Sequence, residues 1–248
     1  MSGIKIFTRK FILVLLVSVT LAACGGKNTQ SPPTGCTAPE DIVLVDIQSV
    51  VDWINAMEKP LTLPCFLQSL PRPLATHSAL SIFSAQPSVG RRSPRVFFFF
   101  DDLILTVAVD QDSEEDVPAE LETHLLEMSF LVDKSELLTA KGEIKFPVIS
   151  DLSNSAPYQK IDFGEEHSSC FLCHPRESAF GTLEGQTIFQ SVMLRSTEPL
   201  PIAELFTESA LCDPQAEPHR CAMLSGITDH GDLVPEDFPP GAPTIFEN

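Results

Sequence analysis

The sequence predicts a mainly β protein, with an antiparallel, sandwich-like domain followed by a cysteine-containing, loop-rich segment of α and irregular structure. Short runs of β-branched and aromatic residues recur before residue 163, and no helical pattern alternates with them, which favours antiparallel pairing over βαβ units. The 21 prolines disfavour long helices. Four of the seven cysteines lie after residue 163, where the composition changes.

Residues 1–23 have the pattern of an export signal. Three basic residues precede an apolar run, 11–23, which is shorter than the ~20 residues that a membrane span takes. The run ends in Leu21-Ala22-Ala23-Cys24, which resembles the lipobox of bacterial lipoproteins. The resemblance implies cleavage before Cys24, a lipid anchor on that cysteine, and an extracytoplasmic location in the bacterial cell envelope. The alternative is an ordinary cleaved signal in which Cys24 has no special role.

The chain after this segment is strongly acidic. Residues 1–23 hold three of the 16 basic side chains and none of the 34 acidic ones, so 13 basic and 34 acidic groups remain, a formal net charge of −21. Such a surface repels nucleic acid and anionic lipid, so we expect no nucleic-acid partner and attachment to the membrane through the lipid alone. Gly25 stands where an Asp would resemble an inner-membrane retention signal, which favours the outer membrane.

Residues 24–40 are rich in Gly, Pro and small polar residues, and we expect a flexible tether. The β-rich domain follows over 41–163. It begins with a β-branched apolar run, 41–47, which is typical of a buried strand, and continues with a short helix over 50–59 that Pro60 ends. Prolines make 61–94 mostly loop, with one strand over 79–84.

The clearest strand signal is a hairpin. The apolar runs 95–100 and 103–109 flank a two-residue polar break, Asp101-Asp102. An acidic loop over 110–120 precedes three further expected strands, over 121–132, 143–149 and 158–163. In the second segment, 164–248, we expect helices over 199–210 and 219–227 and a proline-rich extended end over 235–248.

The most informative stretch is Cys170-Phe171-Leu172-Cys173-His174. Two thiols three positions apart can face one porphyrin edge, and the following imidazole can reach the iron. This C-x-x-C-H pattern resembles the haem-attachment site of c-type cytochromes. The resemblance implies a covalent haem c, with Cys170 and Cys173 as the thioether residues and His174 as the proximal iron ligand.

The sixth ligand of that iron is less constrained by the sequence. Met223 lies 49 residues after His174, a separation that resembles the one between the proximal His and the axial Met in small cytochromes. Met193, His219 and His230 are alternatives. The approach to the motif lacks the aromatic-bearing helix of small cytochromes, so we expect a haem in a loop-rich segment against the β domain.

The remaining cysteines suit disulfides, because an exported protein meets an oxidising compartment. Proximity suggests Cys36–Cys65 and Cys212–Cys221, although four cysteines allow three connectivities. Without haem, six cysteines fit three disulfides equally well. Two further alternatives are a zinc site that adds His167 to the motif residues and a thioredoxin-like redox pair at Cys170 and Cys173.

Together these patterns predict a lipid-anchored, extracytoplasmic c-type haem protein that transfers single electrons, a carrier more than an enzyme, with a peroxidase as a weaker alternative. The surface acidity favours a basic redox partner protein. The other hypothesis is a non-redox envelope lipoprotein, in which the β-rich domain binds a partner or has a structural role and the cysteines form disulfides.

Overall fold

A largely antiparallel sheet organises the chain. The computed structural model describes residues 36–81, 90–109, 124–164, 167–174 and 176–247. In these residues nine strands form one sheet in the order β6-β7-β5-β4-β3-β2-β1-β8, with β9 beside β1. Every described pair is antiparallel except β1–β9. The strands are β1 (Leu74–Leu80), β2 (Arg95–Phe100), β3 (Leu103–Ala108), β4 (Leu125–Asp133), β5 (Leu138–Lys145), β6 (Ser178–Leu183), β7 (Gln186–Val192), β8 (Glu198–Leu200) and β9 (Leu233–Pro235).

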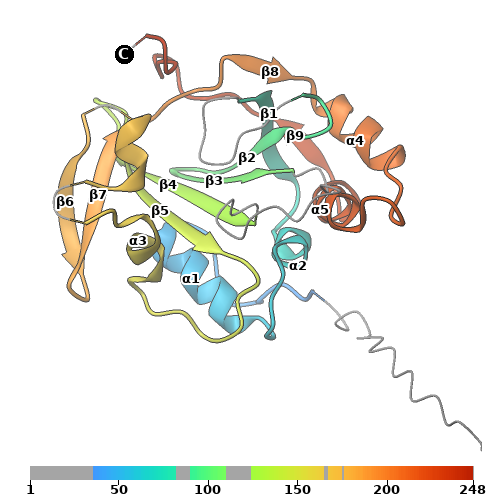
Figure 1. The fold of residues 1–248 in the computed structure, drawn as a ribbon, viewed down its shortest axis with the longest axis horizontal. Helices are drawn as coiled ribbons and strands as arrows, with labels where there is room; N and C mark the ends of the chain where they lie inside the picture. Colours follow the sequence, from blue (N-terminus) through green and yellow to red (C-terminus); the bar gives the residue numbers. More distant parts are fainter. Residues whose placement is uncertain (1–35, 82–89, 110–123, 165–166, 175, 248) are drawn as a thin grey trace, which may run out of the picture. The chain divides into compact units, whose positions relative to one another are not determined.

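Helices supply the second layer. Figure 1 shows α1, α2 and α3 along one side of the sheet, with α4 and α5 beside the β1 end. Helix α3 packs on β5 and β7, and α5 packs on α2. The helices are α1 (Ile47–Ala56), α2 (Leu63–Ser69), α3 (Ala156–Ile161), α4 (Ile202–Ala210) and α5 (Pro218–Thr228), with a 3-10 turn, η1, over Ser169–Leu172.

Alternation along the central strands separates two faces of the sheet. On β2, Val96 and Phe98 belong to the main apolar core, which also includes side chains of α1, α2 and α5. Their neighbours Arg95 and Phe97 face the opposite side, where a much smaller apolar cluster lies. The helix-covered face therefore holds the core, and the other face is free to hold polar groups.

The predicted fold class is confirmed: the protein is mainly β with antiparallel pairing, and the cysteine-containing segment after residue 163 holds α4, α5 and irregular stretches as well as strands β6 to β9. The hairpin of β2 and β3 pairs Phe100 with Leu103 across Asp101-Asp102, as predicted. Helix α4 lies within its predicted range, β4 ends one residue beyond its range, and α5 exceeds its range by one residue at each end, whereas β5 begins five residues earlier than expected. Strands from both sides of residue 163 share the sheet, so these parts of the chain fold as one unit.

Two predicted strands are wrong. Residues 41–46 are irregular and lead into α1 at Ile47, because Asp46 and Ser49 form a capping box: the Ser49 amide donates to the Asp46 carboxylate at 2.7 Å, and the Asp46 amide donates to the Ser49 hydroxyl at 3.0 Å. Residues 158–163 belong mostly to α3, which has Pro157 in its first turn. The expected loop over 61–94 contains α2 and β1, and the strand expected at 79–84 is the end of β1, which starts at Leu74.

Both suggested disulfides are present. Cys36 bonds to Cys65 in α2, and Cys212 bonds to Cys221 in α5. Cys170 and Cys173 are thiols. None of the helices in the described ranges is long and apolar enough to cross a membrane. The expected signal segment, Cys24 and the tether up to residue 35 lie outside the described residues, as do the acidic loop from 110 to 120 and the residues expected to extend β1.

Candidate functional site

The C-x-x-C-H motif is held as one tight turn between α3 and β6. Ser168 caps η1, since its hydroxyl accepts a hydrogen bond from the Cys170 amide at 3.1 Å. The carboxylate of Glu177, which has no solvent exposure, accepts hydrogen bonds from the Ser168 amide at 2.7 Å and from the Ser168 hydroxyl at 2.5 Å. The His174 amide donates to the Cys170 carbonyl at 2.9 Å. The turn therefore fixes both cysteines and the histidine in one place.

The imidazole of His174 is oriented for ligation. Its Nδ1 lies 2.9 Å from the backbone carbonyl of Val192 at the end of β7. A carbonyl only accepts, so Nδ1 carries the proton and Nε2 keeps a lone pair, which is the arrangement of most metal-binding histidines. Burial, together with the positive charge of Lys141, lowers the His174 pKa to about 3. The ring is therefore neutral across the physiological range.

Neither cysteine of the motif is part of a disulfide, so both sulfurs can react or bind a ligand. Both line a pocket of about 260 Å³ on the face of the sheet opposite the core. Burial raises the pKa of the Cys170 thiol to about 11, although Lys141 acts in the other direction, so the sulfur stays protonated at neutral pH. Because the thiolate is the form that binds a metal, a protonated Cys170 disfavours a thiolate metal site here.

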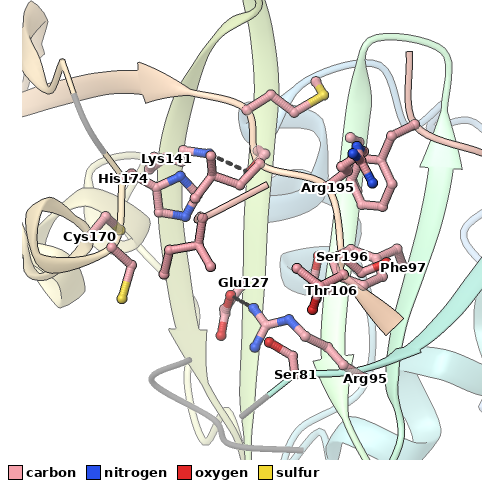
Figure 2. Close-up of a pocket in the computed structure, with 18 of the residues that line it drawn as sticks. Ser81, Arg95, Phe97, Thr106, Glu127, Lys141, Cys170, His174, Arg195 and Ser196 are labelled. Atoms are coloured by element: carbon pink, nitrogen blue, oxygen red, sulfur yellow. Dashed lines mark hydrogen bonds and ion pairs between the residues drawn. The ribbon is translucent and has the colours of Figure 1, made fainter. Parts of the chain in front are cut away.

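The floor of this pocket is made by adjoining rows of cross-strand partners on β2 to β5. One row reads Phe97, Thr106, Glu127 and Glu143, and the next reads Ile104, Ser129 and Lys141 on β3 to β5. Figure 2 shows Cys170 and His174 on one side of the pocket, with Arg95, Phe97 and Ser196 across from them. The pocket therefore extends over about three strand spacings, roughly 14 Å at ~4.8 Å each.

Buried charges of both signs line the floor. Arg95 forms an ion pair with Glu127, and Lys141 donates to the Ser129 hydroxyl at 3.2 Å (Figure 2). Glu127 and Glu143 lie directly opposite each other, a repulsive arrangement that the neighbouring cations offset. Burial lowers the Lys141 pKa to about 8, and the negative groups around it oppose this shift.

Met223 is not at this site, which corrects the prediction of its role as the sixth ligand. It lies on α5 in the main core, with 1% of its surface exposed, and α5 packs against α2 and α4. The spacing argument failed because α5 continues the helical layer, on the opposite side of the sheet from the motif. Met193, the alternative, lines the pocket. His219 and His230 do not line it.

The zinc alternative finds no supporting geometry. Within the described ranges, no group of three or more His, Cys, Asp or Glu side chains is arranged to hold a metal ion. His167, which that set required, instead stacks on Phe171 with ring centroids 4.1 Å apart, and its Nδ1 lies 3.7 Å from the Glu177 carboxylate.

The floor residues were missed from the sequence, although a signal for them exists. In Thr139-Ala140-Lys141-Gly142-Glu143, polar side chains alternate with small ones inside a strand. Such alternation places three polar groups on one face, and their burial on a sheet indicates a second, polar compartment. Comparison with known proteins adds no assignment: no family model, no curated protein and no solved structure matches the chain.

Proposed function

We propose that this chain is a lipid-anchored, extracytoplasmic c-type haem protein that transfers single electrons. One observation carries the proposal. The four other cysteines of the described chain are joined in two disulfides, whereas Cys170 and Cys173 stay as thiols beside an imidazole whose Nε2 is free of the Val192 contact. That combination is what covalent haem attachment requires.

The residues present fit the group. Cys170 and Cys173 would form the two thioethers, His174 would ligate the iron through Nε2, and the Val192 carbonyl would hold the ring in position. Haem iron, when bound, supplies one-electron redox chemistry. The chain itself contributes a fixed ligand, a partly enclosed pocket, and buried charges on Arg95 and Lys141 that act on any charge held there.

The size of the pocket favours a carrier over an enclosed catalytic centre. Its volume of about 260 Å³ is below the ~300–1,000 Å³ of typical small-molecule sites, so it would cover only part of a porphyrin. Phe171 and Leu172, between the two cysteines, are 47% and 84% exposed. An accessible edge suits contact with a partner protein. The acidic surface favours a basic partner and salt-sensitive association.

The decisive experiment is expression of the full chain in a bacterium with active cytochrome c maturation, followed by haem staining of a denaturing gel and a reduced pyridine-haemochrome spectrum. We expect covalent haem at one per chain. Cys170→Ser and Cys173→Ser should each remove one thioether and shift the spectrum. Met223→Leu is the matched control, because it changes a core methionine and should leave the haem spectrum unchanged.

A colourless protein from that host would overturn the haem proposal. A Cys170–Cys173 disulfide, found by mass mapping without reduction, would do the same, because those sulfurs cannot hold both. The remaining hypothesis would then be a non-redox envelope lipoprotein with a β-rich binding or structural domain.

The anchor is tested separately. The full chain should partition into the detergent phase of Triton X-114, and Cys24→Ala should move it to the aqueous phase. If the two partition alike, the lipobox interpretation is wrong, whatever the result of the haem stain.

A further inference from the structure

A serine, a histidine and an aspartate meet at the end of the pocket that lies away from the C-x-x-C-H motif. The Ser196 hydroxyl lies 2.8 Å from Nε2 of His77, and Nδ1 of His77 lies 3.3 Å from the Asp237 carboxylate. The same Nδ1 is 3.3 Å from the backbone carbonyl of Glu236. His77 is on β1, Ser196 follows β7, and Asp237 follows β9.

The surroundings of His77 determine where its proton is. Both groups that face Nδ1, the Asp237 carboxylate and the Glu236 carbonyl, accept hydrogen bonds, so Nδ1 carries the proton in the neutral ring. Nε2 is then an acceptor, and the Ser196 hydroxyl donates to it. This is the direction of hydrogen bonding in which a histidine can remove the proton of a serine nucleophile.

Aromatic rings hold the histidine in place. Edge contacts from Phe97 and Phe238 put their ring centroids 6.0 and 5.3 Å from that of His77. Phe97 and Phe238 also contact each other, with centroids 5.0 Å apart. His77 is 9% exposed, so its ring is shielded while Ser196 lines the open pocket. A fixed base behind an accessible hydroxyl is the geometry that nucleophilic catalysis needs.

We infer that Ser196, His77 and Asp237 form a hydrolytic site that cleaves carboxylic esters with short acyl chains. The site uses none of the residues proposed to hold haem, although it shares their pocket, in which Ser196 lies across from Cys170 and His174 (Figure 2). Ser196 and His77 are its catalytic residues. Asp237 is a positioning residue, which acts by orienting His77.

The reaction balances with an ester and water. The Ser196 oxygen attacks the ester carbonyl while its proton passes to Nε2 of His77, and a tetrahedral oxyanion forms. Collapse breaks the bond to the alcohol, which leaves with the proton from His77, and an acyl-serine remains. Water then attacks that acyl group, gives a proton to His77, and releases the carboxylic acid as Ser196 regains its hydrogen.

The lining of the pocket sets the substrate class. Phe97, Ile104, Met193 and Phe238 are apolar and suit an acyl chain, and a volume of about 260 Å³ limits its length. Figure 2 places Ser196 between Arg95 and Arg195, and both guanidinium groups line the pocket. Arg95 pairs with Glu127 and Arg195 with Glu247, so each positive charge is largely offset by a neighbouring carboxylate.

The test measures hydrolysis of p-nitrophenyl acetate, butyrate and palmitate by the full chain. We expect turnover of the two short esters and none of palmitate. Ser196→Ala and His77→Gln should lower kcat/KM by at least about 100-fold. Ser81→Ala is the matched control, since Ser81 lines the same end of the pocket without a role in the triad.

The positioning role of Asp237 has its own readout. Its side chain is 94% exposed, so water weakens its effect on His77, and Asp237→Asn should lower kcat only by roughly 3- to 10-fold with KM unchanged. Asp237→Glu should restore most of kcat. A purely structural aspartate would instead change thermal unfolding without this split between kcat and KM.

A second measurement does not depend on any variant folding. The wild-type protein, treated with a small alkyl fluorophosphonate, should gain one adduct, which peptide mass mapping should locate on Ser196. An adduct elsewhere, no adduct, or equal ester hydrolysis by wild type and a folded Ser196→Ala would overturn the proposal and leave His77 as a link between β1 and the chain after β9.

Discussion

The two faces of the central sheet are built from the same strands and differ in almost every physical property. On the helix-covered face, neighbouring strands contribute apolar side chains such as Phe98, Leu105 and Met128, all nearly or fully buried. On the pocket face, the residues between them include Arg95, Glu127 and Lys141. Because side chains alternate between the two faces, residues that stabilise the fold lie on one side of the sheet and the polar residues of the candidate site lie on the other. Substitutions can therefore test the two faces separately.

The largest effect should come from breaking the core face. Phe98→Ala removes a fully buried ring and should lower the free energy of unfolding by about 3–5 kcal/mol. Phe97→Ala, one residue away on the pocket face, should cost less, about 1–3 kcal/mol, because an open pocket adjoins it. Urea unfolding measures both. Equal losses would contradict the division between the faces.

A smaller effect should follow from breaking the ion pair on the pocket floor. Arg95→Met leaves the Glu127 carboxylate half-buried without that partner and should cost about 2–3 kcal/mol. The double variant Arg95→Met/Glu127→Met should recover most of the loss, because no charge of the pair then remains. A double variant less stable than the single one would show that the pair itself stabilises the fold.

Close packing of α3 on the core face gives the next test. A Cβ at Gly142 would lie 2.9 Å from the Pro157 Cβ, so Gly142→Ala should cost about 1–2 kcal/mol as the helix is displaced. Gly181, on β6, has nothing within 4 Å of the same position. Gly181→Ala should therefore be neutral or slightly stabilising. Thermal unfolding of both variants measures the difference.

The smallest expected effect is a pH dependence of the free energy of unfolding, which comes from a lysine on the pocket face. Burial lowers the Lys141 pKa from 10.5 to about 8, so between these values the unfolded chain binds more protons than the folded one. Stability should therefore rise with pH across this window, by about 1 kcal/mol from pH 8 to 9. Above pH 9 the raised pKa of Cys170 acts in the opposite direction. Lys141→Met should remove this rise in stability with pH. If the variant and the wild type have the same pH profile of stability, the Lys141 ammonium group is solvated and burial does not lower its pKa.

Local patterns explain which parts of the fold could be predicted. The β2–β3 hairpin was predictable because two apolar strands flank a polar pair that can only be a turn. The run 41–47 was predicted to be a strand because its β-branched residues favour one. The spacing of Asp46 and Ser49 is instead that of a helix cap. At 158–163 the aromatic and β-branched residues again favoured a strand, although Pro157 is typical of a first helical turn.

The residues of the candidate site also fall into those that a local sequence pattern reveals and those that it does not. Cys170, Cys173 and His174 were found because their chemistry depends on adjacent positions. The Ser196–His77 contact joins residues 119 apart, and no local pattern reveals it. Met223 was misplaced because a spacing along the chain says nothing about the side of the sheet on which a helix packs.

The Cys36–Cys65 bond has a mechanical consequence. Cys36 is the first described residue, and its sulfur is joined to α2, where Phe66 and Leu67 are fully buried. Tension applied to the chain ahead of Cys36 therefore passes directly into the interior of the protein, and the residues between the two cysteines carry no load. The folded part of the protein would therefore resist unfolding from its N-terminal end when the chain ahead of Cys36 is pulled.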